Sequence, residues 1–361
     1  MWISLKIGRS LSAQWMTKMT VRRRMRYAVL ACVVSVLLGS TAQGELTSAE
    51  KTAAVKEKEV TYYTAAATGH ATKVKAEAEK ALGIKVNLVR LSSGLVYNRA
   101  VKEFDTAVHT ADVIETSVID HFIDMKKKGM LQPFTPTSIA LYRSPEYYDP
   151  EHYWHASRLG LGAINYNKDL VTDAMVPRTW KDLTDAKYKD KLVQGHIKAS
   201  GTSAILDFFL VKLYGWAYFE ALRTNNILTH QSCDQANLLA SGERLIDLCD
   251  NQVTAPAQAQ GMPIATVFPE DGVFVQVGPI ALLAKAPHPH AGKLFIDWLT
   301  SPAGQTIHVT GGILSPLDSP DVHYPPGFPD VKTLKLLIPD PKEVGAWLPG
   351  AREKFSELFG G

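Results

Sequence analysis

A cluster of small, hydroxylated residues directly precedes an apolar segment in the stretch KASGTSAILDFF, residues 198–209. This cluster combines hydroxyl groups with a backbone that no bulky side chain covers, and it consists of Ser200, Gly201, Thr202 and Ser203. The first N–H groups of a helix have no intrahelical acceptor, and the helix dipole places partial positive charge at that end. Such a turn can hold an anion, present a nucleophilic serine, or simply cap the helix through a serine hydroxyl.

Templates for enzymes match the chain poorly. The sequence contains no Gly-x-Ser-x-Gly elbow, no His-Glu-x-x-His motif, no Walker A loop and no paired Cys-x-x-Cys. Nothing in the sequence places a general base or an orienting acid beside Ser200. We therefore expect no enzyme and no bound cofactor or metal, with an exported hydrolase that uses Ser200 as its nucleophile kept as an alternative.

The distribution of charge argues against one class of partner. The chain has 39 basic and 36 acidic residues, and seven of the basic ones precede Glu45 while no acidic residue does. From Glu45 onward, 32 basic residues face 36 acidic ones, which gives a formal charge of −4. A protein that binds nucleic acid through a general basic surface carries the opposite excess, so we expect no nucleic-acid partner.

The basic residues near the start belong to an export pattern. The run RRRMRY is followed by the apolar stretch AVLACVVSVLLGS and by the small-residue exit TAQG. This order is typical of a signal peptide, and the apolar run is shorter than the roughly 20 residues that span a bilayer. We interpret residues 1–44 as a signal peptide cleaved near Gly44, and Met16, Met19 and Met25 leave a later start codon open. The expected location is the periplasm.

Two cysteines lie in the exported part of the chain. Cys233 and Cys249 would meet an oxidising compartment, where disulfides form and persist. A bridge between them would stabilise the fold by about 3 kcal/mol if it acts by restricting the unfolded chain. Two independent thiols are the alternative.

The hydrophobic pattern alternates short β-rich runs with helical segments. A strand at 59–66, a helix at 71–82 and a strand at 84–91 form a βαβ unit, which predicts parallel strands and a right-handed connection. The repeated alternation places the chain in the α/β class. Further strands are expected at 110–117, 160–167, 244–251 and 272–283, and further helices at 121–130, 206–222, 290–301 and 345–359.

Several stretches, taken in order, carry a family resemblance. They include VTYYTAAATGHATKVKAEAEKALGIKV, TADVIETSVIDHFIDMKKKGMLQPFTP, KASGTSA and VFPEDGVFVQVGPIALLAKAPHPHAGKLFIDWLTSPAGQ, and together they span about residues 58–315. The chain resembles the extracellular solute-binding proteins of ABC importers, in the branch that contains ferric-ion, phosphonate and sugar-phosphate binders. The resemblance implies a monomer that captures a small anionic solute and delivers it to an inner-membrane ABC permease.

The same resemblance implies a fold and its boundaries. The expected architecture is the two-lobed periplasmic-binding-protein fold of type II, an α/β fold in which a cleft between the lobes closes on the ligand by hinge motion. Lobe one would comprise residues 58–157 and 272–317, and lobe two residues 158–271 and 318–361.

Ferric relatives bind their metal through side chains that this sequence lacks. The resemblance aligns the ligand positions with Ala67, Ser117, Gln252 and Val253. None of these side chains supplies the anionic oxygen that hard Fe(III) requires. Ferric binding through non-standard ligands such as Tyr62, Tyr63 or Tyr166 is kept as an alternative.

The part of the site that holds an anion in these relatives does match. The resemblance assigns it to Ser200, Gly201 and Thr202, with further positions at Ser232 and at Asp250 or Asn251. Lobe one would add Thr64, Ser92, Ser93 and Ser117 from loops that follow strands, where open α/β sheets bind their ligands.

Charged residues near these positions suggest the kind of anion. Arg158 is the expected charge partner, because a guanidinium group pairs with carboxylate or phosphate in a bidentate manner; a surface arginine near the hinge is the alternative. Asp250 would repel a fully anionic ligand but would pair with an ammonium group. This combination suits a zwitterion such as an aminophosphonate.

Overall fold

The structure is a computed structural model that describes residues 46–326 and 328–360. The signal peptide predicted for residues 1–44 lies outside this part of the chain. Within the described residues, no helix has both the length and the apolar character needed to cross a bilayer.

The elements alternate along the chain as an α/β fold requires. The strands are β1 (Glu59–Thr64), β2 (Lys85–Arg90), β3 (Val113–Glu115), β4 (Leu131–Gln132), β5 (His155–Asn167), β6 (Leu192–Gly195), β7 (Leu228–His230), β8 (Ile246–Asp250), β9 (Ile264–Val267), β10 (Val273–Leu283) and β11 (Leu336–Leu337). The helices are α2 (Ser48–Glu57), α3 (Thr68–Leu82), α4 (Ser93–Asp105), α5 (Ile119–Lys127), α6 (Gly201–Tyr214), α7 (Ala217–Thr224), α8 (Ala236–Ser241), α9 (Thr254–Ala259), α10 (Pro289–Leu299), α11 (Pro302–Thr310) and α12 (Pro341–Phe359).

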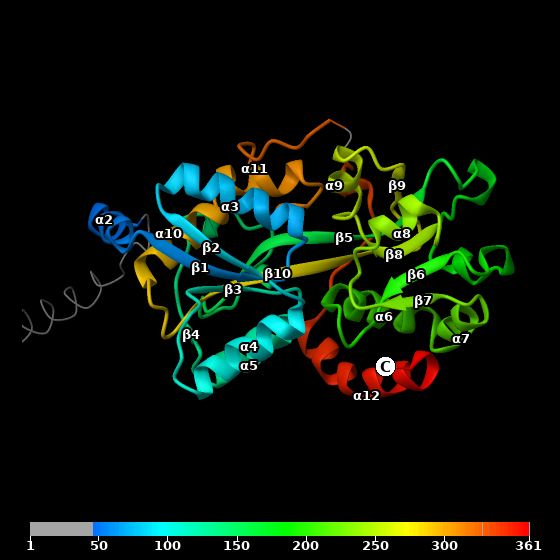
Figure 1. The fold of residues 1–361 in the computed structure, drawn as a ribbon, viewed down its shortest axis with the longest axis horizontal. Coiled ribbons are helices and arrows are strands. Elements are labelled where there is room, and N and C mark those ends of the chain that lie inside the picture. The colour runs from blue at the N-terminus through cyan, green and yellow to red at the C-terminus, as the bar shows by residue number, and fades with distance from the viewer. Residues whose placement is uncertain (1–45, 327, 361) are drawn as a thin grey trace, which may run out of the picture. The chain divides into compact units, whose positions relative to one another are not determined.

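The predicted βαβ unit is confirmed. Strand β1 pairs in parallel with β2, in the register Glu59 opposite Lys85 to Thr64 opposite Arg90, and also in parallel with β3. Alternate side chains of β1 enter two different cores: Tyr62 packs with α3 and α10, and Tyr63 packs with α4 and α5. Helices therefore cover both faces of this part of the sheet (Figure 1).

Two long strands connect the two groups of elements. The strand order is β2-β1-β3-β10-β5-β8-β6-β7, so β10 and β5 lie between the β1–β3 group and the β6–β8 group. Strand β10 pairs antiparallel with both β3 and β5, and β5 pairs antiparallel with β8. We call the β1–β3 group with its helices the first lobe and the β6–β8 group the second lobe.

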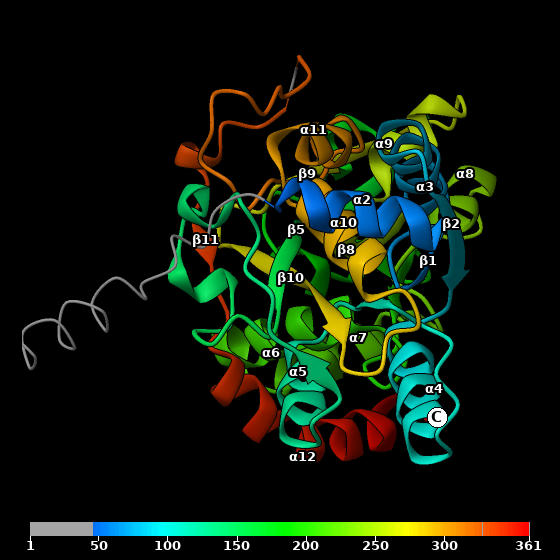
Figure 2. The ribbon, with the colours of Figure 1, turned by 90° about the vertical axis from the view of Figure 1, so that its left-hand side faces the viewer.

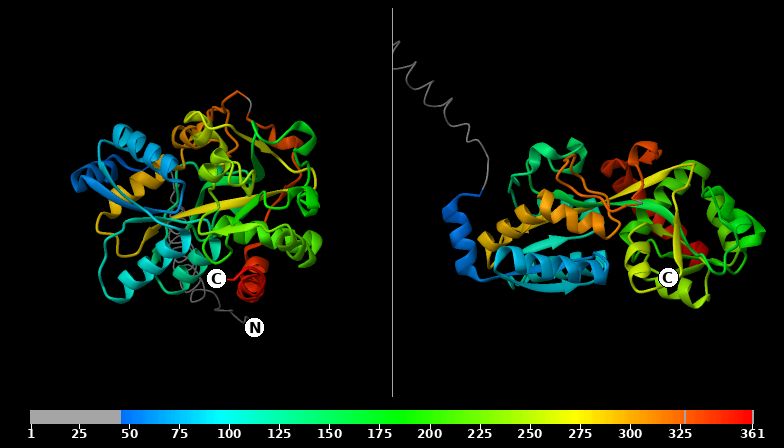
Figure 3. Two further views of the ribbon diagram at one scale, coloured as in Figure 1. Left: turned by 45° about the vertical axis from the view of Figure 1, so that its right-hand side comes forward. Right: turned by 90° about the horizontal axis from the view of Figure 1, so that it is seen from above.

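The carboxyl-terminal helix packs into the second lobe. Val344, Leu348, Ala351 and Phe355 of α12 are buried in the same hydrophobic cluster as α6 and α7. On another side, α12 contacts α5 of the first lobe (Figure 2). Strands β5 and β10 run between the lobes in the further views of Figure 3.

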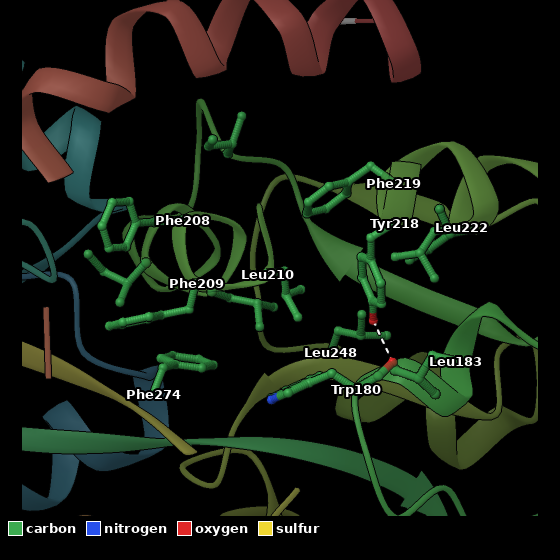
Figure 4. Packing of buried hydrophobic residues seen from close by; sticks show 14 of the residues in the cluster. Trp180, Leu183, Phe208, Phe209, Leu210, Tyr218, Phe219, Leu222, Leu248 and Phe274 are labelled. Atoms are coloured by element: carbon green, nitrogen blue, oxygen red, sulfur yellow. Dashed lines mark hydrogen bonds between the residues drawn. The ribbon is translucent and has the colours of Figure 1, made fainter. Parts of the chain in front are cut away.

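The second lobe has an aromatic core. Phe208 and Phe209 of α6 lie near Phe274 of β10 and the buried Trp180 (Figure 4). The Tyr218 hydroxyl of α7 donates to the Trp180 carbonyl at 2.8 Å, so the polar end of this core side chain is satisfied. This core fixes α6, whose first residues reach the candidate site.

The single helix predicted at 206–222 is wrong. Helix α6 ends at Tyr214, and α7 starts at Ala217. Gly215 between them has a φ of 70° and a ψ of −179°, a conformation outside the helical region that ends the helix and that glycine adopts without steric cost. The apolar pattern continues through the break because both helices face the same core.

Candidate functional site

A cavity of about 470 Å³ lies where the segments that follow β1, β2 and β3 face those that follow β6, β7 and β8. The carboxyl ends of strands from both lobes meet there, as expected for a ligand site in an open α/β fold. Nine of the eleven predicted ligand-binding residues line it: Ser92, Ser93, Ser117, Arg158, Ser200, Gly201, Thr202, Ser232 and Asp250.

The two other predicted residues, Thr64 and Asn251, form hydrogen bonds within the fold. Thr64 is fully buried at the end of β1, and its hydroxyl donates to Glu115 Oε2 at 2.5 Å. Asn251 accepts from the Leu161 backbone N–H at 3.1 Å and donates to the Gly312 carbonyl. Neither side chain lines the cavity.

Helices α3, α4 and α6 all begin at this cavity. Their N-cap residues Ala67, Ser92 and Ser200 each line it. The first two make no side-chain capping hydrogen bond, so the amino-terminal N–H groups of α3 and α4 receive no acceptor from their own caps. Because each helix also directs the positive end of its dipole there, the cavity is suited to negative charge.

The turn at α6 is both a cap and an open donor site. Ser200 Oγ accepts from the Ser203 N–H at 3.2 Å. The N–H groups of Gly201 and Thr202 meet no hydrogen-bond acceptor among the described residues. The capping and anion-binding interpretations of this turn are therefore compatible.

If Ser200 were a nucleophile, it would need a general base. His196, the histidine nearest to it in the sequence, is not free to act as one. His196 Nδ1 accepts from the Lys198 N–H at 3.2 Å, and His196 Nε2 donates to the Gly360 carbonyl at 2.9 Å. Both ring nitrogens are thus engaged away from Ser200.

Arg90 is a cavity residue that the sequence analysis missed. It is the last residue of β2, directly before the segment that carries Ser92 and Ser93. Its Nε donates to the Ala66 carbonyl at 3.0 Å, and it forms no ion pair with the described residues. Ser92 and Ser93 were predicted to bind the ligand because they follow a strand. The same argument applies to Arg90 at the end of this strand, so its position could have been predicted from the sequence.

Arg158 is buried and paired, so its alternative interpretation as a surface arginine is wrong. Only 1% of the residue is exposed, and its Nε lies 2.8 Å from Glu115 Oε1 in an ion pair. Its other nitrogens donate to Gln252 Oε1 at 3.0 Å and to Ser117 Oγ at 3.3 Å. Arg158 lines the cavity, but Glu115 already balances its charge.

Glu115 was also missed, and its surroundings keep it ionised. Burial acts to raise the pKa of this carboxyl, but Arg158 and the hydroxyls of Ser157, Thr64 and Tyr62 outweigh burial and hold the pKa below its ordinary value.

Two of the tyrosines considered as non-standard iron ligands, Tyr62 and Tyr63, have other partners. Burial and the neighbouring Glu115 raise the pKa of Tyr62 well above its ordinary value, and its hydroxyl donates to Glu115. Tyr63 donates to Glu103 at 2.8 Å, and burial raises its pKa to about 12. None of Tyr62, Tyr63 and Tyr166 lines the cavity.

Acidic residues lie on the second-lobe side of the cavity. Asp234 and Asp250 both line it. Burial raises the pKa of Asp250 to about 6, against the lowering effects of the Gln252 N–H and of Arg158. The Asp250 carboxylate accepts from the Gln252 N–H at 3.1 Å and from Gln252 Nε2 at 2.8 Å.

Cys233 and Cys249 form a disulfide with a Cα–Cα distance of 5.5 Å. The bridge ties the segment that contains Ser232 and Asp234 to the end of β8, directly before Asp250. It therefore fixes the acidic side of the cavity.

Comparison with known proteins identifies the family. Residues 109–333 match the model of the bacterial extracellular solute-binding proteins. The chain belongs to this family. A probable ABC transporter periplasmic-binding protein of Sinorhizobium fredii is 26% identical over 233 residues, which cover 62% of this chain and 64% of that relative. A putative 2-aminoethylphosphonate-binding periplasmic protein of Salmonella typhimurium is 30% identical over 242 residues, covering 63% and 68% of the two chains.

Solved structures confirm the two-lobed fold of periplasmic binding proteins. AfuA from Actinobacillus pleuropneumoniae, solved with fructose-6-phosphate, superposes with a TM-score of 0.73 over 83% of this chain and 98% of AfuA, at 23% identity. Iron-bound HitA from Pseudomonas aeruginosa superposes with a TM-score of 0.70 over 82% and 99% of the chains, at 16% identity.

Proposed function

We propose that this protein is the periplasmic solute-binding component of an ABC importer, not an enzyme. It captures a small organic anion in the cavity by closure of the lobes and delivers it to an inner-membrane permease. Family membership and the named relatives support the transport role. We assign residues 58–157 and 272–317 to lobe one and residues 158–271 and 318–361 to lobe two, and we expect a monomer.

The main observation in support of an anionic ligand is that α3, α4 and α6 all begin at the cavity. Helix amino termini bind phosphate and carboxylate groups through free N–H groups and the positive end of the dipole. Arg90 adds a full positive charge on the first-lobe side. The hydroxyls of Ser92, Ser93 and Thr202 supply further donors for oxygen atoms.

The acidic residues point to a second charge on the ligand. Asp234 and Asp250 would repel a purely anionic molecule, whereas an ammonium group would compensate their charge. We propose that the ligand is a zwitterion with an anionic group toward Arg90 and the helix termini and an ammonium group toward Asp250. An aminophosphonate has this chemistry, in agreement with the name of the Salmonella relatives.

Calorimetry and thermal shift test the proposal on the chain without residues 1–44. The probes are 2-aminoethylphosphonate, ethylphosphonate, inorganic phosphate, fructose-6-phosphate and Fe(III). A ligand at 100 times its dissociation constant adds about 2.7 kcal/mol of stability, enough to raise the melting temperature by several degrees. We expect this shift with 2-aminoethylphosphonate.

A variant with an added negative charge tests the location of the site. Thr202→Asp places a carboxylate beside the free N–H groups of α6 and should weaken 2-aminoethylphosphonate binding by about tenfold or more through repulsion. The matched control is Ser48→Asp, at the exposed start of α2 outside the cavity, which should bind like the wild type. Equal affinity of the Thr202→Asp variant would contradict the proposed site, and a shift with Fe(III) alone would contradict the ligand class.

A further inference from the structure

One short segment of the first lobe lies against two glycines of the second. The segment Ser117–Asp120 runs from the connection after β3 into the first turn of α5. A Cβ atom added at Gly201 of α6 would lie 2.5 Å from Val118 Cγ2 and 3.0 Å from the Ser117 carbonyl oxygen. A methyl group does not fit there, so the first turn of α6 approaches this segment only because residue 201 is glycine.

The second contact lies on α12. A Cβ atom added at Gly345 would lie 2.7 Å from Asp120 Oδ1 and 3.2 Å from both Cγ and Oδ2 of Asp120. Gly345 lies within α12, four residues before Pro349, and does not have positive φ, so its own backbone dihedral angles do not require glycine. Glycine in a helix interior is less stable than alanine, and the close contact with Asp120 is one feature of the fold that favours glycine at this position.

The two sides of this contact belong to different lobes. Asp120 lies in the first turn of α5, whose Phe122 and Met125 are buried in the core of the first lobe. Gly345 follows Val344, which is buried in the core of the second lobe. A groove of about 760 Å³ between α4, α5 and α12 borders the contact, so α12 meets the first lobe closely at Gly345 while a wide space lies beside it.

We propose that Gly345 is a positioning residue for ligand capture: by accepting Asp120 against the bare backbone of α12, it sets how closely the two lobes can close. Gly345 does not line the ligand cavity, so it acts through the lobe arrangement. The inference rests on the proposed function, because closure is there the step that encloses the ligand. A bulky side chain at position 345, too large to be accommodated by rotation of the Asp120 carboxylate, would hold the lobes apart.

Interlobe distances test this proposal without any ligand. Spin labels at the exposed positions Lys102 of α4 and Arg223 of α7, introduced as Lys102→Cys and Arg223→Cys, report the separation of the lobes by pulsed EPR. Gly345→Leu should shift the distance distribution of the ligand-free protein toward longer values, and Gly345→Ala should shift it less. An unchanged distribution in Gly345→Leu would overturn the proposal.

Gly350 provides a matched control on the same helix. A Cβ atom at Gly350 meets nothing within 4 Å, and this residue is exposed. Gly350→Leu should therefore leave the distances and the affinity for 2-aminoethylphosphonate unchanged, whereas Gly345→Leu should weaken that affinity by about tenfold, since less of the protein reaches the closed state.

A double variant separates a steric block from a folding defect. Asp120→Ala removes the carboxylate that a new Cβ would meet, so Gly345→Ala combined with Asp120→Ala should show the same distances and affinity as Asp120→Ala alone. If Asp120→Ala does not rescue Gly345→Ala, the steric mechanism is wrong. If wild-type protein does not bind 2-aminoethylphosphonate but the distances respond as expected, the proposed ligand fails and the positioning role of Gly345 stands.

Discussion

At the residue scale, the Asp250 carboxylate gives the cavity a pH dependence. Burial raises its pKa to about 6, so Asp250 loses its proton between pH 5 and 7. Above this pKa the negative charge attracts an ammonium group, and below it the attraction is lost. The affinity for 2-aminoethylphosphonate relative to ethylphosphonate should therefore rise by about tenfold from pH 5 to pH 7, as measured by calorimetry.

The ratio of the two affinities measured in Asp250→Asn serves as the internal reference, since the phosphonate groups of the ligands titrate in the same way whichever protein is used. The ratio should change with pH by about tenfold less in Asp250→Asn than in the wild type, because position 250 cannot ionise. A ratio that stays constant in the wild type would show that the ammonium group does not meet Asp250.

The sequence predicted most of the polar residues around the cavity, but not which of them are already engaged. Ser92, Ser117 and Thr202 could be placed because small polar residues at strand ends and helix starts gather at one edge of an α/β sheet. Thr64 and Glu115 also lie at strand ends. Only the packed structure shows that these two side chains bond to each other inside the sheet.

At the scale of elements, the disulfide holds one wall of the cavity. The Cys233–Cys249 bridge closes a loop with a sequence separation of 16 and ties the segment after β7 to β8. Replacing both cysteines with serine should lower the free energy of unfolding by about 3 kcal/mol. The melting temperature should fall by about 5–10 °C.

The same double variant should bind 2-aminoethylphosphonate more weakly, because Asp234 and Ser232 lose their tether. A control with dithiothreitol separates the bridge from the substitution: the reductant should lower the melting temperature of the wild type toward that of the variant. An unchanged melting temperature in the serine variant would show that the bridge does not stabilise this region.

Element boundaries were predictable where local chemistry sets them. The βαβ unit followed from hydrophobic pattern alone, and Gly83 ends α3 in the left-handed conformation that glycine favours. The break between α6 and α7 was missed, since the apolar pattern runs through it and only the Gly215 backbone conformation ends the helix. Helix α4 was missed because its start was interpreted only as a ligand-binding loop.

At the scale of the whole molecule, Arg158 connects the two lobes through buried polar contacts. It lies on β5, one of the two long connecting strands, and pairs with Glu115 of the first lobe. Its Nη1 donates to Gln252, which in turn donates to Asp250 of the second lobe. The hinge region therefore contains a continuous set of hydrogen bonds from Glu115 to Asp250, and any change at Arg158 should affect both lobes.

Removing Arg158 tests this connection. Arg158→Met would leave the fully buried Glu115 without its cation and should cost about 3–5 kcal/mol of stability at pH 7. The stabilisation that ionised Glu115 provides at neutral pH should weaken. In the wild type the lowered pKa of Glu115 stabilises the fold above the ordinary pKa of 4.5, and this contribution is lost as the pH falls through the folded-state pKa. In the variant the hydroxyls of Ser157, Thr64 and Tyr62 still oppose burial but the cation is gone, so the pKa of Glu115 should rise and the stability gained above pH 4.5 should shrink.

Combining Arg158→Met with Glu115→Gln distinguishes an uncompensated charge from a loss of packing. The double variant has no buried charge at this pair, so denaturant unfolding at pH 7 should show that much of the lost stability returns. Binding should not return with it, because the contact from Arg158 to Gln252 stays broken and the position of Asp250 is no longer coupled to the first lobe. Recovery of both stability and 2-aminoethylphosphonate affinity would contradict the proposed coupling between Asp250 and the first lobe. It would show that Arg158 only compensates the charge of Glu115.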